Sequence, residues 1–234
     1  MTLDTRLKKY EKIGGNVRFL DVDGPIRHML HPIRGKGGFK TIEQCAEKFI
    51  EYMLLVQKEY PDIEFFALTN FPNWGYRGDI AYWDGSNWGD YHVALEAITR
   101  LAKKNDAPLR GFTVDNPYDY ILGEVRPPSI KYDPKTVNWL ERVLDVEKHC
   151  RENNLEFNLI FNSQRGGQTS AELFCKESLA FIDFYHAQGG KPDRYIIQSW
   201  YTHPDRNEIV PESNPNTFTG LVKAVIKKVK KIKD

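Results

Sequence analysis

Five short apolar segments, each followed by a helical pattern, recur along this chain at nearly constant spacing. They cover residues 17–23, 63–70, 109–115, 155–162 and 194–200, and their first residues are 46, 46, 46 and 39 residues apart. A β-hairpin needs only about two to five residues between its strands, whereas a parallel crossover needs about a dozen or more. The spacing therefore predicts a parallel sheet made of strand–helix units.

Amphipathic patterns fill the gaps between these predicted strands. Apolar residues recur at steps of three and four within residues 42–54, 92–104, 137–144, 173–182 and 221–229. Side chains that commonly cap helices precede three of these segments. Thr41 is placed to cap the first, Asp133 the third and Thr169 the fourth.

The chain reads as one (β/α) barrel-like domain over residues 1–234, because no low-complexity linker interrupts the repeat. A complete eight-unit barrel usually needs about 250 residues at a shorter unit spacing. Five units are too few to close a barrel, which predicts a TIM-barrel-like repeat in a shortened or incomplete form. A homo-oligomer could complete such a barrel, and an open doubly wound sheet is the alternative fold.

Composition narrows the classes of function. The chain has 33 Lys and Arg against 32 Asp and Glu, a net charge of +1, which argues against nucleic acid as the main partner. No apolar run approaches the roughly 20 residues of a membrane span. The charged N-terminal residues do not resemble a signal peptide, so a cytoplasmic location is expected unless the chain belongs to a longer exported protein. Three widely spaced cysteines exclude a disulfide scaffold.

Polar side chains stand where the predicted strands end. In sheets of this kind ligands bind at the carboxyl ends of the strands, so these side chains are expected to share one site. The candidates are Asp21, Asp23, Asn70, Asp115, Asn116, Asn162, Gln164 and Trp200.

Tryptophan is concentrated in one loop. Three of the five tryptophans lie between residues 74 and 88, directly after the second predicted strand. Indole rings stack on the C–H faces of sugars while the N–H reaches a polar partner. We therefore expect Trp74, Trp83 and Trp200 to form a platform for a sugar, although such rings also fold back into cores.

Paired carboxyl groups at the strand ends predict hydrolysis of a glycosidic bond in an oligosaccharide or polysaccharide. Asp23 is the expected general acid and Asp115 the base or nucleophile. Asp21 shares a face with Asp23 and could raise the pKa of that group through like-charge repulsion. Glu212 is a further carboxylate after the fifth strand, and the amides would donate to sugar hydroxyls. No cofactor and no metal are required for this chemistry.

The segment PDRYIIQSWYTHPDRNEIVPESNPNTFTGLV, residues 192–222, resembles the C-terminal part of bacterial TIM-barrel proteins of glycoside-hydrolase type. These proteins carry a similar Gln-Ser-Trp, Pro-Glu and Thr-Phe-Thr series. LEFNLIFN, APLRGFTVD and GGNVRFLDVDGPI resemble earlier strands of the same barrel. The resemblance implies a barrel whose first strands precede those present here.

Two positions depart from that family pattern. Asp23-Gly24-Pro25 stands where the family has Asp-Glu-Pro, and Thr69-Asn70 stands where an acidic residue is expected. A non-catalytic sugar-binding relative is therefore one alternative function.

The segment FLDVDGPI also fits the first motif of haloacid-dehalogenase-like phosphatases. There Asp21 would be the nucleophile and Asp23 the acid/base, with Asp115 and Asp119 holding Mg²⁺. This alternative leaves the two strand–helix units after residue 119 without a role.

Overall fold

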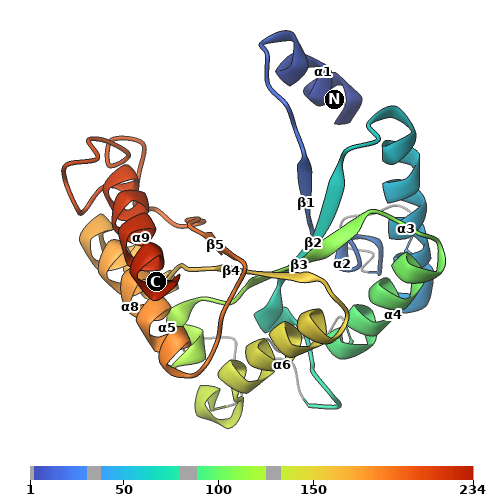
Figure 1. Cartoon of the computed structure of the whole chain (residues 1–234). Coiled ribbons are helices and arrows are strands. Elements are labelled where there is room, and N and C mark those ends of the chain that lie inside the picture. Colours follow the sequence, from blue (N-terminus) through green and yellow to red (C-terminus); the bar gives the residue numbers. More distant parts are fainter. Residues whose placement is uncertain (1–2, 31–37, 80–88, 125–132, 234) are drawn as a thin grey trace.

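Five parallel strands form a sheet that curls into a half-barrel (Figure 1). A computed structural model describes residues 3–30, 38–79, 89–124 and 133–233. The strands are β1 (Phe19–Asp23), β2 (Glu64–Asn70), β3 (Leu109–Asp115), β4 (Glu156–Ile160) and β5 (Arg194–Ile196). They pair in sequence order, β1-β2-β3-β4-β5, and every pair is parallel. The predicted parallel (β/α) repeat is confirmed.

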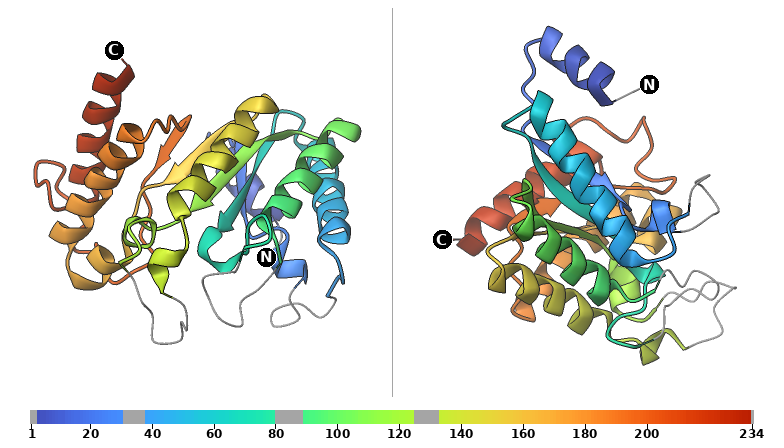
Figure 2. Two further views of the ribbon diagram at one scale, coloured as in Figure 1. Left: turned by 90° about the horizontal axis from the view of Figure 1, so that it is seen from below. Right: turned by 90° about the vertical axis from the view of Figure 1, so that its right-hand side faces the viewer.

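Helices cover the convex side of the curl (Figure 2). The long ones are α3 (Ile42–Glu59), α4 (Tyr91–Lys104), α6 (Trp139–Glu152) and α8 (Ala171–Ala187), with α9 (Phe218–Lys233) packed on α8. The shorter ones are α1 (Leu3–Lys12), α2 (Arg27–Leu30), α5 (Tyr118–Ile121) and α7 (Gln164–Thr169), with 3₁₀ turns at Phe71–Asn73 and Pro134–Thr136. The strand order never reverses, so the sheet lacks the switch point of a doubly wound fold. A second copy that completes the barrel stays a prediction.

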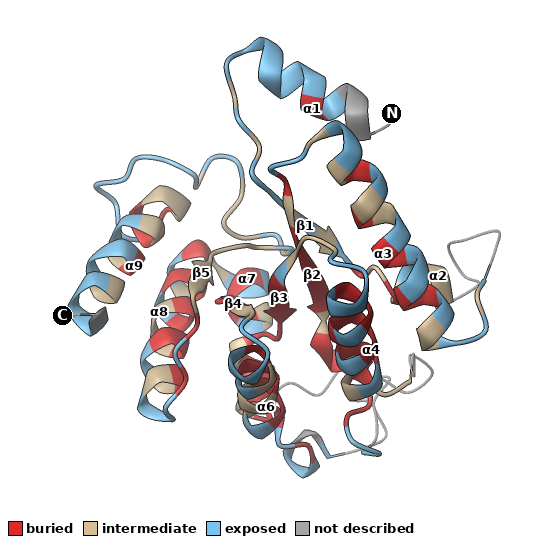
Figure 3. Cartoon of the chain, turned by 45° about the vertical axis from the view of Figure 1, so that its right-hand side comes forward, coloured by how far each residue is buried: buried red, intermediate tan, exposed pale blue. Residues whose placement is uncertain are grey.

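The two faces of the sheet differ in chemistry because successive side chains alternate between them. The outward face is apolar and forms one core with α3, α4, α6 and α8 (Figure 3); it carries Phe65, Ala67, Phe112, Val114, Phe157 and Leu159. The inward face carries polar side chains on four strands; they are Asp21, Asp23, Asn70, Thr113, Asp115 and Asn158. Within the described ranges, no helix combines the length and apolarity that a bilayer crossing requires.

The helix starts agree with the sequence in one case of three. Thr41 caps α3 as predicted, accepting a hydrogen bond from the backbone N–H of Gln44 at 3.2 Å. Asp133 instead caps a 3₁₀ turn, and α6 begins later with Asn138 as its cap. Ser170, rather than Thr169, caps α8. In both corrected cases a later residue of equal or better capping ability takes the position: Asn138 lies five residues after Asp133, and Ser170 directly follows Thr169.

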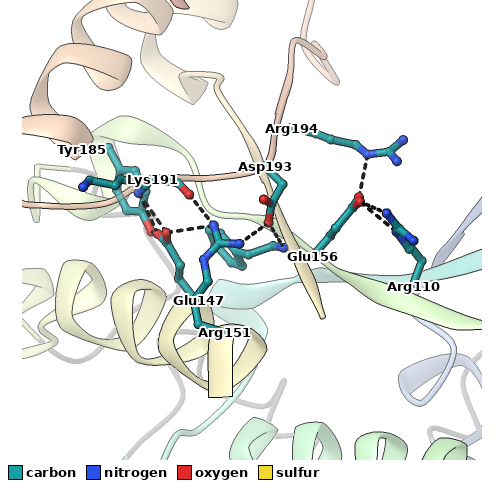
Figure 4. Close-up of polar contacts among 9 residues, drawn as sticks. Arg110, Glu147, Arg151, Glu156, Tyr185, Lys191, Asp193 and Arg194 are labelled. Carbon is teal, nitrogen blue, oxygen red and sulfur yellow. Dashed lines mark hydrogen bonds and ion pairs between the residues drawn. The ribbon is translucent and has the colours of Figure 1, made fainter. Parts of the chain in front are cut away.

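The N-terminal end of the sheet is fastened by charged side chains (Figure 4). Glu156 on β4 accepts hydrogen bonds from Arg110 Nε at 2.7 Å and from Arg194 Nε at 3.0 Å. The Arg194 guanidinium also lies 4.0 Å from the ring centre of Phe19 on β1. These contacts link the first, third, fourth and fifth strands across the curl.

A second network holds the segment that leads into β5. Asp193 accepts a hydrogen bond from Arg151 at 2.6 Å, and Glu147 accepts from the Tyr185 hydroxyl at 2.6 Å and from the backbone N–H of Lys191 at 2.9 Å. The strand itself spans only Arg194–Ile196, shorter than the predicted 194–200. Side chains of α6 and α8 therefore fix a strand that has few ladder hydrogen bonds of its own.

Gly111→Ala tests the close approach of β3 to β4. A Cβ at Gly111 would overlap the backbone carbonyl of Glu156 and lie 3.0 Å from its nitrogen. Because strand backbone cannot move aside as a side chain can, we expect a loss of about 2–3 kcal/mol in the free energy of unfolding, measured with urea. Gly38→Ala is the control, because its nearest neighbour would lie 4.0 Å away. Equal unfolding midpoints for the two variants would contradict the packing described.

Candidate functional site

A pocket of about 380 Å³ opens at the carboxyl ends of the strands. Its size lies at the lower end of the range typical for small-molecule sites. Five of the predicted site residues line it; they are Asp23, Asn70, Asp115, Gln164 and Trp200. Residues far apart in the sequence, one from each of the five strand–helix units, thus meet at one place.

Asp115, the last residue of β3, is the buried acid of this pocket and is 4% exposed. Burial, together with the nearby Asp23 charge, raises its pKa to about 6, while a hydrogen bond from Asn162 opposes the shift. The Asn162 side-chain nitrogen lies 3.0 Å from the carboxylate, and the indole N–H of Trp200 also donates to it. Asn162 therefore donates a hydrogen bond to Asp115 and is not itself part of the pocket lining.

Asp23, the last residue of β1, has a contrasting environment. Its side chain is 44% exposed and forms a long ion pair of 3.4 Å with Arg27, four residues later on α2. The two aspartates differ in solvation and in partners, although they share one pocket.

Gly24, directly after Asp23, adopts a backbone conformation that favours glycine. Its φ of +57° lies in the left-handed region, which residues other than glycine rarely adopt. Its backbone N–H donates a hydrogen bond to the Leu68 carbonyl at 2.8 Å. A Cβ here would lie 2.6 Å from Arg27 Nε. A glutamate would therefore strain this turn, and glycine is the residue that fits.

Asp21 lies one layer below the pocket. Its carboxylate accepts a hydrogen bond from the Thr113 hydroxyl at 2.8 Å, and Asn158 donates to that hydroxyl at 3.1 Å. Desolvation raises the pKa of Asp21 to about 6, and the negative charge of Asp23 contributes. Asp21 is not among the residues that line the pocket.

The tryptophans divide between core and pocket. Trp200 is 60% exposed and lines the pocket, as predicted. Trp74 is 1% exposed and its ring packs on Tyr91 with centres 5.4 Å apart, so the prediction of a sugar platform is wrong for Trp74. It is a core residue because the chain after β2 folds its rings inward beneath α4. Trp83 lies outside the described residues.

Trp200 is positioned by the segment that follows β5. The backbone N–H of His203 donates to the Gly167 carbonyl at 2.8 Å, and Ser199 donates to the His203 carbonyl at 2.6 Å. A Cβ at Gly167 would lie 2.6 Å from the Tyr201 Cβ, so glycine permits the close contact of this segment with α7. Sequence analysis missed Tyr201, which also lines the pocket.

Two other predicted residues lie elsewhere. Glu212 forms an ion pair with Lys223 at 3.1 Å and is not part of the pocket lining. Asn116 is fully buried beside Asp115, and within the described part of the chain its side-chain atoms have no hydrogen-bond partner.

Asp119, a magnesium ligand in the phosphatase alternative, lies beside the start of α7. Asp119 is fully buried and accepts hydrogen bonds from the backbone N–H groups of Gln164 and Arg165 at 2.9 and 3.1 Å. Among the described residues no three His, Cys, Asp or Glu side chains gather closely enough to hold a metal ion. The three cysteines, Cys45, Cys150 and Cys175, are buried as free thiols.

Comparison with known proteins adds no family assignment. No protein-family model matches the sequence, and no curated protein matches it.

Asp115→Asn tests the burial of this acid. The pKa of Asp115 is about 6 in the folded protein and 3.8 ordinarily. As the pH rises, Asp115 therefore loses its proton at a lower pH in the unfolded chain than in the folded protein. Stability is therefore lost as the pH rises from about 4 to 6, by up to about 3 kcal/mol. We expect Asp115→Asn to raise the free energy of unfolding at pH 8 by about 1–3 kcal/mol, with no gain below about pH 4.

Urea unfolding at several pH values makes this measurement. Asp62→Asn is the matched control, because Asp62 is exposed; it should change the free energy of unfolding by less than about 0.5 kcal/mol at every pH. A gain that does not vary with pH would contradict the raised pKa of Asp115.

Proposed function

We propose that this chain hydrolyses a glycosidic bond in an oligosaccharide or polysaccharide bound in the pocket at the strand ends. One observation carries the proposal: two aspartates in contrasting environments, Asp115 and Asp23, line the same pocket as the exposed indole of Trp200. Glycoside hydrolysis needs one protonated and one ionised carboxyl group beside the bond. The resemblance of residues 192–222 to glycoside-hydrolase-type barrels agrees with this chemistry.

Asp115 is the general acid and Asp23 the base or nucleophile in this proposal, opposite to the roles expected from sequence. Burial raises the pKa of Asp115 to about 6, which keeps a proton available for the leaving oxygen. Asp23 is 44% exposed and lies 3.4 Å from the Arg27 guanidinium, so its carboxylate is accessible from the pocket. Asp21 supports the pair from below through its charge.

Trp200, Asn70 and Gln164 would bind the sugar. The indole offers a flat apolar face, and the two amides offer hydrogen-bond donors to sugar oxygens. Asn162 keeps Asp115 in place with its 3.0 Å hydrogen bond. The side chains that bind and the side chains that react thus come from different strand ends.

A non-catalytic sugar-binding protein is the second candidate. Asn70 ends β2 where the resembled family has an acid, and the backbone at Gly24 disfavours a second one. The same pocket would then bind sugar without cleaving it. The phosphatase alternative has less support, because Asp21 lies below the pocket and Asp119 is committed to the start of α7.

Mutation of the two aspartates tests the enzyme proposal. With a saccharide identified by its effect on thermal stability, hydrolysis should fall about 100-fold or more in Asp115→Asn and in Asp23→Asn. The wild-type rate should fall about tenfold per pH unit above about pH 6, where Asp115 loses its proton. Product release measured by chromatography gives the rates.

Asp62→Asn, at an exposed site, should retain the wild-type rate. Full activity in both pocket variants would end the proposed mechanism. Stabilisation by a saccharide with no turnover at any pH would favour the binding protein instead.

A further inference from the structure

Tyr201 follows Trp200 in the sequence and lines the same pocket. Its backbone N–H donates to the Ser199 Oγ atom at 3.3 Å. Within the described part of the chain, no group forms a hydrogen bond with the Tyr201 hydroxyl. The hydroxyl oxygen is also not among the polar atoms that are sealed from solvent without a partner, so it is accessible. An accessible polar group in a pocket is available to a ligand.

Other oxygen atoms of the pocket are already engaged within the protein. The hydroxyl of Tyr120, the second tyrosine of the pocket, donates to the Gln164 Oε1 atom at 2.9 Å. The Asn70 Oδ1 atom accepts from the Asn73 side-chain nitrogen at 2.5 Å. The Tyr201 hydroxyl differs from these groups because it keeps its capacity both to donate and to accept a hydrogen bond.

The Tyr201 ring is held against the backbone of α7. A Cβ at Gly167 would lie 2.5 Å from the Cδ2 atom of Tyr201 and 2.8 Å from its Cγ atom, so glycine leaves the room that the ring occupies. The chain on either side of the ring is fixed by the hydrogen bond from Ser199 to the His203 carbonyl and by that from the His203 N–H to Gly167. A hydroxyl on such a support loses little conformational freedom when a ligand binds.

The surroundings of Tyr201 keep its hydroxyl neutral. Burial raises the pKa of Tyr201 above the ordinary value of 10.0, and the negative charges of Asp115 and Asp119 raise it too. The phenol therefore keeps its proton at neutral pH. Because the charge of Asp115 acts on this hydroxyl and both residues line the pocket, the two groups face the same part of it.

We propose that Tyr201 is a specificity-determining residue of the sugar site, and that its hydroxyl binds a ring hydroxyl of the sugar unit next to Asp115. This inference rests on the proposed function. A sugar hydroxyl donates and accepts, and so does the phenol, so the two groups are complementary. A sugar that lacks this hydroxyl leaves the phenol without its partner and is bound and cleaved less well. The pocket therefore selects among sugars by the position of one free hydroxyl group.

Tyr201→Phe tests this role, with a saccharide found through its effect on thermal stability. The value of kcat/KM should fall about three- to tenfold, which is the usual worth of one hydrogen bond between neutral groups. The pH above which the rate falls should stay at about 6, because Asp115 is unchanged in this variant. Product release measured by chromatography gives the rates. If the saccharide binds without turnover, dissociation constants from titration calorimetry take their place.

Monodeoxy sugars identify the partner of the Tyr201 hydroxyl. Each ring hydroxyl of the two sugar units that adjoin the cleaved bond is replaced in turn by hydrogen. One analogue should be about three- to tenfold poorer than the parent saccharide for the wild type and equal to the parent for Tyr201→Phe. The other analogues should lose the same factor with both proteins. A purely structural role of the ring would not produce coupling at a single hydroxyl.

Tyr52→Phe is the matched control. Tyr52 is half-buried on α3, where its ring packs on Phe65 with centres 5.9 Å apart, and it does not line the pocket. Removal of its hydroxyl should leave kcat/KM within about twofold of the wild type for the parent saccharide and for every analogue.

The outcomes separate the two proposals. Equal rates or affinities of Tyr201→Phe and the wild type would overturn the role of Tyr201 and leave sugar hydrolysis standing. A loss in Tyr201→Phe that is the same for the parent and for every monodeoxy analogue would also overturn it, because no sugar hydroxyl would then be coupled to the phenol. A failure of every saccharide to bind or to be cleaved would remove the proposed function together with this inference.

Discussion

Each strand of the curled sheet presses one face against helices and turns the other toward the inside of the curl. In β1 this places Leu20 and Val22 outward and Asp21 and Asp23 inward. A shift of the register by one residue would bury the two acids among apolar helix side chains, which is costly for charged groups. The packing of the outer face therefore decides which strand side chains reach the pocket.

The pocket also depends on contacts that lie far from it. Trp200, which donates to Asp115, lies in the segment after β5. That strand has only three residues, Arg194–Ile196, and so forms few hydrogen bonds with β4. That strand is held at its other end by Glu156, and the preceding segment by Glu147 on α6. A buried acid with a raised pKa is tolerated because the surrounding network keeps its partners in place. The fifth strand thus connects the charged contacts at the N-terminal end of the sheet with the pocket at the carboxyl end.

The sequence predicted the parts of this structure that depend on local periodicity. Strand positions, their parallel arrangement and the polar strand ends follow from spacing and alternation. The burial of Trp74 could not be predicted, because a tryptophan in a loop has the same composition whether it packs on Tyr91 or faces a ligand. The segment after the early end of β5 is held by distant partners, such as the Gly167 carbonyl that accepts the His203 N–H, and no local pattern encodes them.

The turn at Gly24 bears on the arrangement of the two acids that line the pocket. The left-handed backbone at this position, φ +57°, allows the turn in which Arg27 returns to within 3.4 Å of Asp23. A glutamate in the same place would lose that backbone conformation, so the first strand can carry only one acid into the pocket. The second carboxyl group has to come from another strand end, and Asp115 on β3 is buried there with its own donors. The turn at Gly24 and the burial of Asp115 therefore belong to one arrangement, in which the two carboxyl groups of the pocket stand on different strands.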